Sequence, residues 1–154
     1  MQKLLRLIRP WMIYAIAAMW MAFVFWKALT GRLGVEPIDA LLRAYGERGF
    51  QFVLIGLAIS PLRQWTGISL LHLRRAFGLS AFALLAAHLF VFWLLDLRSL
   101  SRLGTEIAER PYITLGMAGF VLLIPLALTS TDSALRKLGP KWHSLQRLVY
   151  PAAV

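Results

Sequence analysis

The chain has 154 residues, of which 59% are hydrophobic and only 16% are charged, and its mean hydropathy is +0.66. Soluble domains carry about 25% charged residues, and several apolar runs here are long enough to cross a bilayer. The composition therefore predicts an all-α integral membrane protein. The lack of cysteine excludes disulfides, thiolate metal sites and cysteine nucleophiles. The net charge of +10 does not indicate nucleic-acid binding, because the basic residues flank apolar runs.

The apolar runs predict one membrane domain over residues 1–154, a bundle of four transmembrane helices followed by the start of a truncated fifth. The four spans are expected at about 11–29, 45–62, 76–95 and 111–131, and the incomplete fifth begins at about 148. The first span follows a basic N-terminus, as in a signal peptide, but no small-x-small cleavage site follows its apolar run. We therefore interpret it as an uncleaved helix. The second is the weakest, because only 14 residues separate Arg48 from Arg63. In the fourth, the spacing of Gly116 and Gly119 predicts helix packing.

The distribution of basic residues predicts the orientation in the membrane. The N-terminal tail and the second and fourth loops hold ten basic residues and one acid, Asp132: Lys3, Arg6, Arg9, Arg63, Arg74, Arg75, Arg136, Lys137, Lys141 and Arg147. The opposite face has seven basic residues and six acids. Because basic loops stay on the cytoplasmic side, we expect a multi-pass protein of a bacterial inner membrane with a cytoplasmic N-terminus.

The third span contains an ionisable residue, His88, within 20 uncharged residues from Ala76 to Leu95. An ionisable side chain at membrane depth is costly and needs a partner or a function. His88 follows Arg75 by 13 residues, about 20 Å along a helix, so we expect it in the outer half of the bilayer. Neutral imidazole is a standard axial ligand of haem iron. The alternative is a hydrogen bond from the ring to a carbonyl or hydroxyl of a neighbouring helix, and spacing leaves both interpretations open.

Four further residues could bind ligands in the predicted cytoplasmic loops. Arg74 and Arg75 precede the third span and could pair with haem propionates, a flavin (FMN) phosphate or lipid phosphate, although topology anchoring is the favoured interpretation. They lie near the cytoplasmic face, whereas His88 is expected in the outer half of the bilayer. The propionates of a haem held by His88 would reach them only if that haem extends inward. His72 and His143 are loop histidines that could be ligands, but loop histidines are usually solvated.

Three stretches of the sequence, taken together, resemble a known family. They are "ISPLRQ" at 59–64, "LRRAFGLSAFALLAAHL" at 73–89 and "RPYITLGMAGFVLLIPLALTSTDSALRKLGPKW" at 110–142. They are similar to the ferric reductase-like transmembrane family, and within it to the haem-binding membrane subunits of bacterial methionine sulfoxide reductases. "LGVEPIDALLRAYGERGF" at 33–50 also fits the first outer loop of that family.

The resemblance implies a haem b protein that carries electrons across the inner membrane. The electrons would come from the quinone pool or a cytoplasmic flavin reductase. They would pass to a periplasmic molybdopterin methionine sulfoxide reductase that repairs oxidised proteins. His88 matches the histidine that this family carries in its third span, and the resemblance therefore implies that His88 is an axial ligand of the haem iron.

The end of the chain departs from the family pattern. The family has a histidine in a W-x-x-L-H-x-x-V-Y pattern, whereas this chain reads "WHSLQRLVY", with Gln146 at that position and His143 one helical turn earlier. A second ligand at the depth of His88 would need to lie roughly 13 residues beyond Arg147, near position 160. A further family histidine is expected in that region. The residues present therefore predict an incomplete bis-histidine site.

Three hypotheses follow from these observations. The chain is a haem b electron-transfer subunit, or a haem-less membrane anchor or truncated remnant that only docks a partner, or a related oxidoreductase with another acceptor. The third is disfavoured because such enzymes usually append flavin and nicotinamide domains. We do not expect catalysis by the polypeptide, because the sequence contains no paired carboxylates or Ser–His–Asp set; the redox chemistry would belong to the cofactor.

Overall fold

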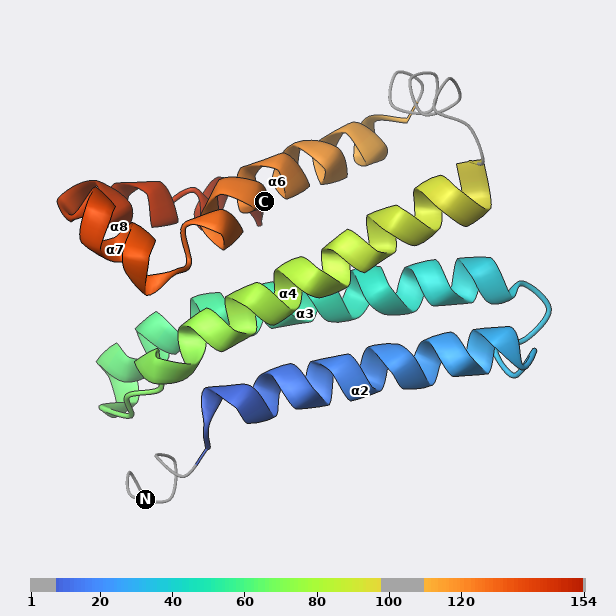
Figure 1. Ribbon diagram of the computed structural model, residues 1–154, viewed down its shortest axis with the longest axis horizontal. Coiled ribbons are helices and arrows are strands. Elements are labelled where there is room, and N and C mark those ends of the chain that lie inside the picture. The colour runs from blue at the N-terminus through green and yellow to red at the C-terminus, as the bar shows by residue number, and fades with distance from the viewer. Residues whose placement is uncertain (1–7, 98–109, 154) are drawn as a thin grey trace. The chain divides into compact units, whose positions relative to one another are not determined.

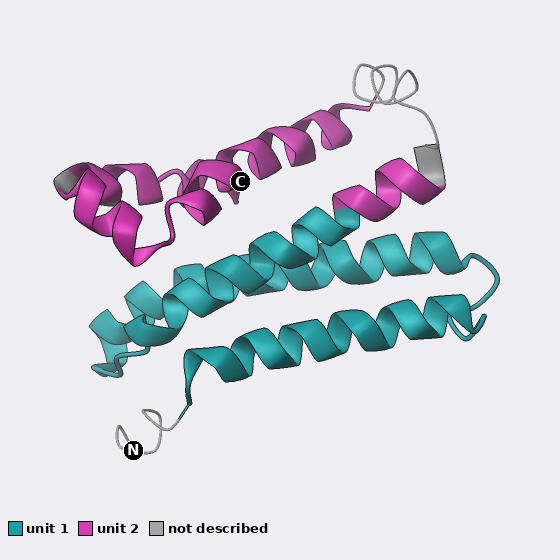
Figure 2. Cartoon of the chain, in the orientation of Figure 1, with its two compact units in different colours: residues 1–88 teal, residues 89–154 magenta. Residues whose placement is uncertain are grey.

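The computed structural model describes residues 8–97 and 110–153, and all regular structure within these ranges is helical (Figure 1). The chain divides into two compact units, residues 1–88 and 89–154 (Figure 2). Unit 1 contains α2 (Pro10–Leu29), α3 (Pro37–Thr66) and most of α4 (Leu71–Val91). Unit 2 contains the end of α4, the π-helix η1 (Phe92–Leu97), α6 (Pro111–Leu128), α7 (Asp132–Leu138), α8 (Pro140–Gln146) and α9 (Val149–Ala152). The prediction of an all-α protein is confirmed for the described residues.

Local sequence signals set the ends of the helices in unit 1. Both α2 and α3 have proline in the first turn, where the missing N–H costs no intrahelical hydrogen bond. The end of α3 is set by Gly67, whose φ of 72° is the left-handed conformation that glycine adopts readily. Its N–H donates to the carbonyl of Arg63, and the chain then turns back into α4.

Helices α2 and α3 pack through an aromatic contact on one face of α3. The hydroxyl of Tyr45 donates a hydrogen bond of 2.9 Å to the carbonyl of Met21 on α2. The Tyr45 ring lies 6.2 Å from the ring of Trp20, and the guanidinium of Arg48 lies 5.6 Å from the Trp20 ring. The buried residues of α3 recur every three or four positions, as one helix face requires: Leu41, Tyr45, Gly49, Val53, Gly56 and Ile59.

Helices α3 and α4 run antiparallel, and their contacts follow a constant register. From the α2–α3 turn inward, four pairs meet in order: Gly46 with His88, Gly49 with Leu85, Gly56 with Phe77, and Ser60 with Arg74. Ser60 follows Gly46 by fourteen positions on α3, and Arg74 precedes His88 by fourteen positions on α4. The three glycines of α3 let α4 approach closely, because no side chain separates the two backbones.

Unit 2 is organised around the end of α6. The hydroxyl of Thr129 donates to the carbonyl of Pro125, and that of Ser130 donates to the carbonyl of Leu126, both at 2.6 Å. Beyond α7 and α8, α9 returns to α6, where a Cβ placed on Gly119 would lie 3.0 Å from the carbonyl oxygen of Ala152. The packing role predicted for Gly119 is confirmed. For Gly116 it stays a prediction, because no atom of the described residues lies within 4 Å of a Cβ there.

The helix bounds correct several predicted spans. Three helical segments of the described chain are long and apolar enough to cross a membrane: Pro10–Leu29, Leu71–Leu95 and Pro111–Leu128. The predicted span 45–62 lies inside α3, which has 30 residues and a length of about 45 Å. Its crossing of the membrane stays a prediction, as does the four-helix bundle. The fourth helix ends at Leu128 rather than Thr131, because the hydroxyls of Thr129 and Ser130 bond to its last turn.

Two other bounds also differ from the prediction. Helix α4 begins at Leu71 rather than Ala76, since a helix continues through Arg74 and Arg75 where an uncharged run stops. A helix does begin near residue 148, but α9 has only four residues, Val149–Ala152. The short helices α7 and α8 were not predicted, although Thr131 caps α7 by accepting a hydrogen bond from the Ala134 N–H.

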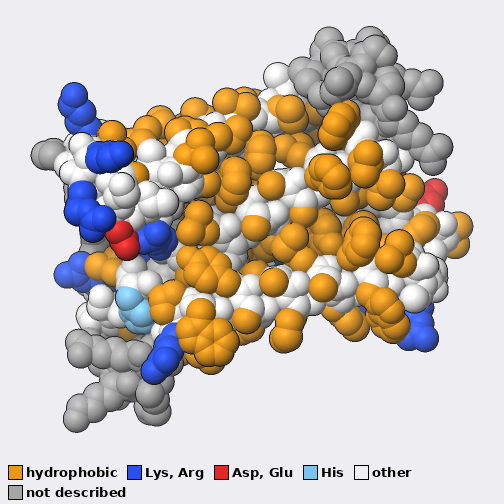
Figure 3. Space-filling model, viewed as in Figure 1, with side chains coloured by type: hydrophobic (Ala, Val, Ile, Leu, Met, Phe, Trp, Pro, Cys, Tyr) orange, Lys and Arg blue, Asp and Glu red, His pale blue; other side chains and the backbone are white. Residues whose placement is uncertain are grey.

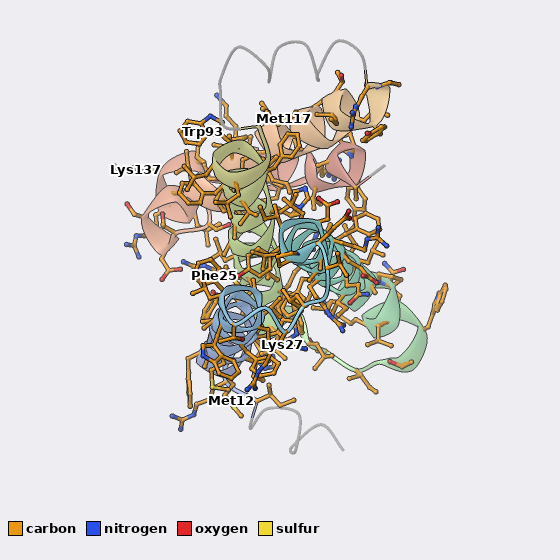
Figure 4. The ribbon with its side chains drawn as sticks, turned by 90° about the vertical axis from the view of Figure 1, so that its right-hand side faces the viewer. Met12, Phe25, Lys27, Trp93, Met117 and Lys137 are labelled. Atoms are coloured by element: carbon orange, nitrogen blue, oxygen red, sulfur yellow. The ribbon has the colours of Figure 1, made fainter. Side chains whose placement is uncertain are left out.

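The surface of α2 is that of a lipid-facing helix. Its length is covered by hydrophobic side chains, with Lys and Arg toward its two ends (Figure 3). Viewed nearly end-on, the helix carries side chains on all sides, among them Met12, Phe25 and Lys27 (Figure 4). Large apolar residues such as Trp11, Met19 and Phe23 are more than half exposed. Exposed apolar side chains around the helix are stable in hydrocarbon but not in water.

The Gly49–Leu85 contact gives a test of the packing between α3 and α4. A Cβ on Gly49 would lie 2.8 Å from two side-chain atoms of Leu85 and 3.3 Å from its backbone nitrogen. We expect Gly49→Ala to lower the free energy of unfolding in detergent by about 1–3 kcal/mol, the usual cost of overpacking. Gly78→Ala is the matched control, because no atom of residues 8–97 or 110–153 lies within 4 Å of a Cβ there. Equal thermal unfolding midpoints for the two variants would contradict this packing.

Candidate functional site

The candidate site centres on His88, which lies in the second half of the apolar segment Leu71–Leu95. The Nδ1 atom of its half-buried ring lies 2.9 Å from the carbonyl oxygen of Leu42 on α3. A carbonyl oxygen can only accept, so Nδ1 carries the proton and donates. In this tautomer the Nε2 atom has no proton and keeps a lone pair. The contact thus leaves His88 with one nitrogen available as a ligand.

The His88 ring lies directly against the backbone of α3 at Gly46. A Cβ on Gly46 would be 3.0 Å from Nδ1 and 3.2 Å from Cε1 of the ring. In an α-helix the Leu42 carbonyl also accepts the hydrogen bond from the Gly46 N–H. Because a carbonyl oxygen has two lone pairs, it can serve both donors. The glycine therefore gives the imidazole access to a backbone acceptor that a side chain would cover.

Several residues next to this contact are buried, and the charged side chains beside it are exposed. Leu84, one turn before His88 on α4, is fully buried, and Leu85 packs on Gly49. On α3, Tyr45 is buried against α2, whereas the charged Glu47 is exposed. The ring is thus held between helices in surroundings of low polarity, where hydrogen bonds are stronger than in water.

Both interpretations of His88 that the sequence left open can now be assessed. The hydrogen bond to a carbonyl of a neighbouring helix is present. The ligand role stays a prediction, and the two are compatible because they use different ring nitrogens. Leu42 and Gly46 were not singled out from the sequence. The signal that could have found them is the pair of glycines in "YGERG" at 45–49, which permits close helix packing.

Arg74 and Arg75 lie at the other end of α4 from His88. The guanidinium of Arg74 donates to the Ser60 hydroxyl at 3.2 Å. Fourteen residues, or about 21 Å of helix, separate Arg74 from His88. His72, at the start of α4, donates from Nε2 to the carbonyl of Ile8 at 3.3 Å and so connects α4 to the segment before α2. Ligand roles for Arg74, Arg75 and His72 stay predictions.

In unit 2, side chains of α8 bind the end of α6. The indole N–H of Trp142 donates to the Thr129 carbonyl at 2.9 Å. The amide nitrogen of Gln146 lies 3.4 Å from both the Leu126 carbonyl and the Thr129 hydroxyl, at the weak end of the hydrogen-bonding range. His143 is on the same helix, but its side chain lies outside the described residues, so its predicted ligand role stays a prediction.

A metal centre held entirely by side chains is not found in residues 8–97 and 110–153, since no three His, Cys, Asp or Glu residues there are grouped to hold an ion. Axial ligation of a haem iron has a different requirement, because the porphyrin supplies four nitrogens and the protein one or two ligands. The Nε2 atom of His88 would be one such ligand.

Comparison with known proteins places the chain within a family. Residues 48–154 match the family described as "Ferric reductase like transmembrane component". The chain is 38% identical over 143 residues to the "Protein-methionine-sulfoxide reductase heme-binding subunit MsrQ" of Brucella anthropi, and 40% identical to proteins of that name from Brucella ovis and Brucella canis. Each alignment covers 92% of this chain and 65% of the relative, so the chain spans about two thirds of these relatives' length. No solved structure matches.

The hydrogen bond from Trp142 to the Thr129 carbonyl should help to hold α8 at the end of α6. Trp142→Phe removes the indole donor and keeps an aromatic ring, so we expect a local loss of about 1 kcal/mol. Amide hydrogen exchange over residues 140–146 should rise about fivefold, which is that free energy converted to an exchange ratio. Trp65→Phe is the control, because Trp65 is 86% exposed. Unchanged exchange in the Trp142 variant would show that this bond does not hold α8.

Proposed function

Because the chain belongs to the ferric reductase-like transmembrane family, we propose that it is a haem b membrane subunit. It passes electrons from the quinone pool or a flavin donor across the bacterial inner membrane to a periplasmic molybdopterin methionine sulfoxide reductase, an MsrP-like partner, for repair of oxidised proteins. The similarity to MsrQ proteins, which are named heme-binding subunits, supports this proposal. The protein acts in the lipid bilayer and does not bind nucleic acid.

The observation that carries the proposal is the orientation of His88. Histidines that bind a metal almost always donate their other ring N–H to a carboxylate, carbonyl or water, which sets the tautomer and the ring direction. His88 has this arrangement, with Nδ1 on the Leu42 carbonyl and Nε2 left for iron. When bound, the haem supplies one-electron redox chemistry. The chain's own part is to supply an oriented ligand and, through the apolar residues around it, an environment that lowers solvent access.

The second candidate function is a haem-less anchor that docks the partner. Gln146 favours it, because its amide lies on the end of α6 in place of the family's imidazole. The described histidines also supply a haem iron with one ligand rather than two. His72 is the other histidine whose side chain is described, and it bonds at the opposite end of α4. The described side chains of unit 1 therefore supply His88 as the one imidazole at this depth.

Arg74 and Arg75 are proposed to bind a phosphate at the cytoplasmic face. Their separation from His88 by about 21 Å disfavours the propionates of a haem on His88 and favours the phosphate of FMN or of lipid. Arg74 is already oriented by the Ser60 hydroxyl. A flavin at this end would place the electron donor on the opposite face from the periplasmic acceptor.

The haem proposal is tested by a dithionite-reduced minus oxidised absorbance spectrum of the purified chain. We expect a sharp b-type signal that is lost in His88→Gln, because the amide is a poor iron ligand, and retained in His72→Gln. Absence of the signal in the unsubstituted chain would refute the haem function and leave the anchor function. A signal that survives in His88→Gln would remove His88 from the ligand set.

The orientation is tested by labelling with cysteine, because the chain has none of its own. Val35 lies in the α2–α3 turn and Ser69 in the α3–α4 turn, and both are exposed. With the N-terminus in the cytoplasm, Val35→Cys should react with an impermeant maleimide from the periplasm. Ser69→Cys should react only after the inner membrane is opened. The reverse pattern would invert the proposed topology, and labelling of both from the periplasm would mean that α3 does not cross.

A further inference from the structure

We propose that Gly46 is a positioning residue for His88, which holds the imidazole in the tautomer and direction that an iron ligand needs. This inference rests on the proposed haem function and assigns a role to a position on α3, the helix that does not carry the ligand. Two observations support it, the space around Gly46 and the hydrogen bond of the ring.

The space at Gly46 is already filled by the ring. A Cβ at this position would approach Nδ1 to 3.0 Å, Cε1 to 3.2 Å and Cγ to 3.6 Å. These contacts are with atoms of a rigid ring, which cannot fold away as the end of a flexible side chain can. Any other residue therefore displaces the imidazole from α3. Because the hydrogen bond to Leu42 spans 2.9 Å, a displacement of a few tenths of an ångström weakens it.

The weakened bond has further consequences. To the extent that Nδ1–H loses the Leu42 acceptor, it becomes an under-bonded donor between two helices, which is costly. The alternative tautomer moves the proton to Nε2 and removes the lone pair that would bind iron. Donation from Nδ1 also raises the basicity of Nε2, so its loss weakens the ligand even in the correct tautomer. The substitution should therefore lower haem affinity by about 10–100-fold, the usual effect of losing such a partner.

The two neighbouring glycines of α3 supply matched controls. Gly49 packs on Leu85 rather than on the imidazole, so Gly49→Ala disturbs the same helix pair without contacting the ring. Gly56→Ala should be tolerated, because its Cβ would make an ordinary contact of 3.8 Å with Phe77. The comparison thus separates a general loss of helix packing from a specific effect on His88.

The first measurement is the tautomer of His88 in the haem-free chain, read from ¹⁵N chemical shifts of the imidazoles in detergent. The His88 signals are identified by their loss in His88→Gln. We expect the Nδ1–H tautomer in the unsubstituted chain, in Gly49→Ala and in Gly56→Ala, and a shift toward Nε2–H or a mixture in Gly46→Ala. The Nε2–H tautomer in the unsubstituted chain, or an unchanged spectrum in Gly46→Ala, would overturn the inference. Because this reading needs no haem, it separates the role of Gly46 from the haem function.

The second measurement is a titration of each variant with hemin, followed by absorbance. Affinity should fall about 10–100-fold in Gly46→Ala and less than that in Gly49→Ala. If the unsubstituted chain binds no hemin, the haem function fails and the ligand-positioning role fails with it. If it binds and Gly46→Ala binds equally well, the haem function stands and the role of Gly46 alone is overturned. Circular dichroism of each variant shows that the helices are retained.

Discussion

The close approach of α3 and α4 is the constraint on which the site depends. A residue without a Cβ lets two helix backbones approach closely, so that a short, rigid side chain such as imidazole can reach a carbonyl of the neighbouring helix. Gly46 satisfies this condition beside His88, and Gly49 satisfies it one turn further along. The distance from Nδ1 to the Leu42 carbonyl is therefore a property of helix packing, and the state of the imidazole follows from it.

An imidazole in an apolar segment usually suggests a choice between a structural and a functional histidine. That choice does not apply here, because the ring has two nitrogens with different roles. The bond from Nδ1 compensates part of the cost of placing a polar group at this depth. The same bond leaves Nε2 as the acceptor. A histidine made stable in this way is already prepared as a ligand, which is why spacing along one helix could not separate the two interpretations.

The sequence predicted the elements better than the contacts between them. Apolar length and flanking proline located α2 and α6 to within a few residues. At α3 the charged residues made the predicted span too short, because hydropathy falls at Glu47 and Arg48 while the helix continues through them. Helices α7 and α8 are too short and polar for a hydrophobic pattern, although the Thr131 cap was a readable signal. His88 was identified as a candidate, but Leu42 and Gly46 depend on the register between two helices, which no single-helix pattern contains.

The register also separates two kinds of chemistry within unit 1. Because α3 and α4 advance residue for residue, Ser60 and Arg74 meet at one end, and Leu42, Gly46 and His88 meet near the other. The guanidinium end suits anionic phosphate, which it can bind through charge-assisted hydrogen bonds. The imidazole end suits a metal, which requires a neutral nitrogen lone pair. A membrane electron carrier has to receive electrons at one face and release them at the other. The antiparallel pair holds the guanidinium of Arg74 and the imidazole of His88 apart along that direction, at a spacing set by helix rise, as the proposed function requires.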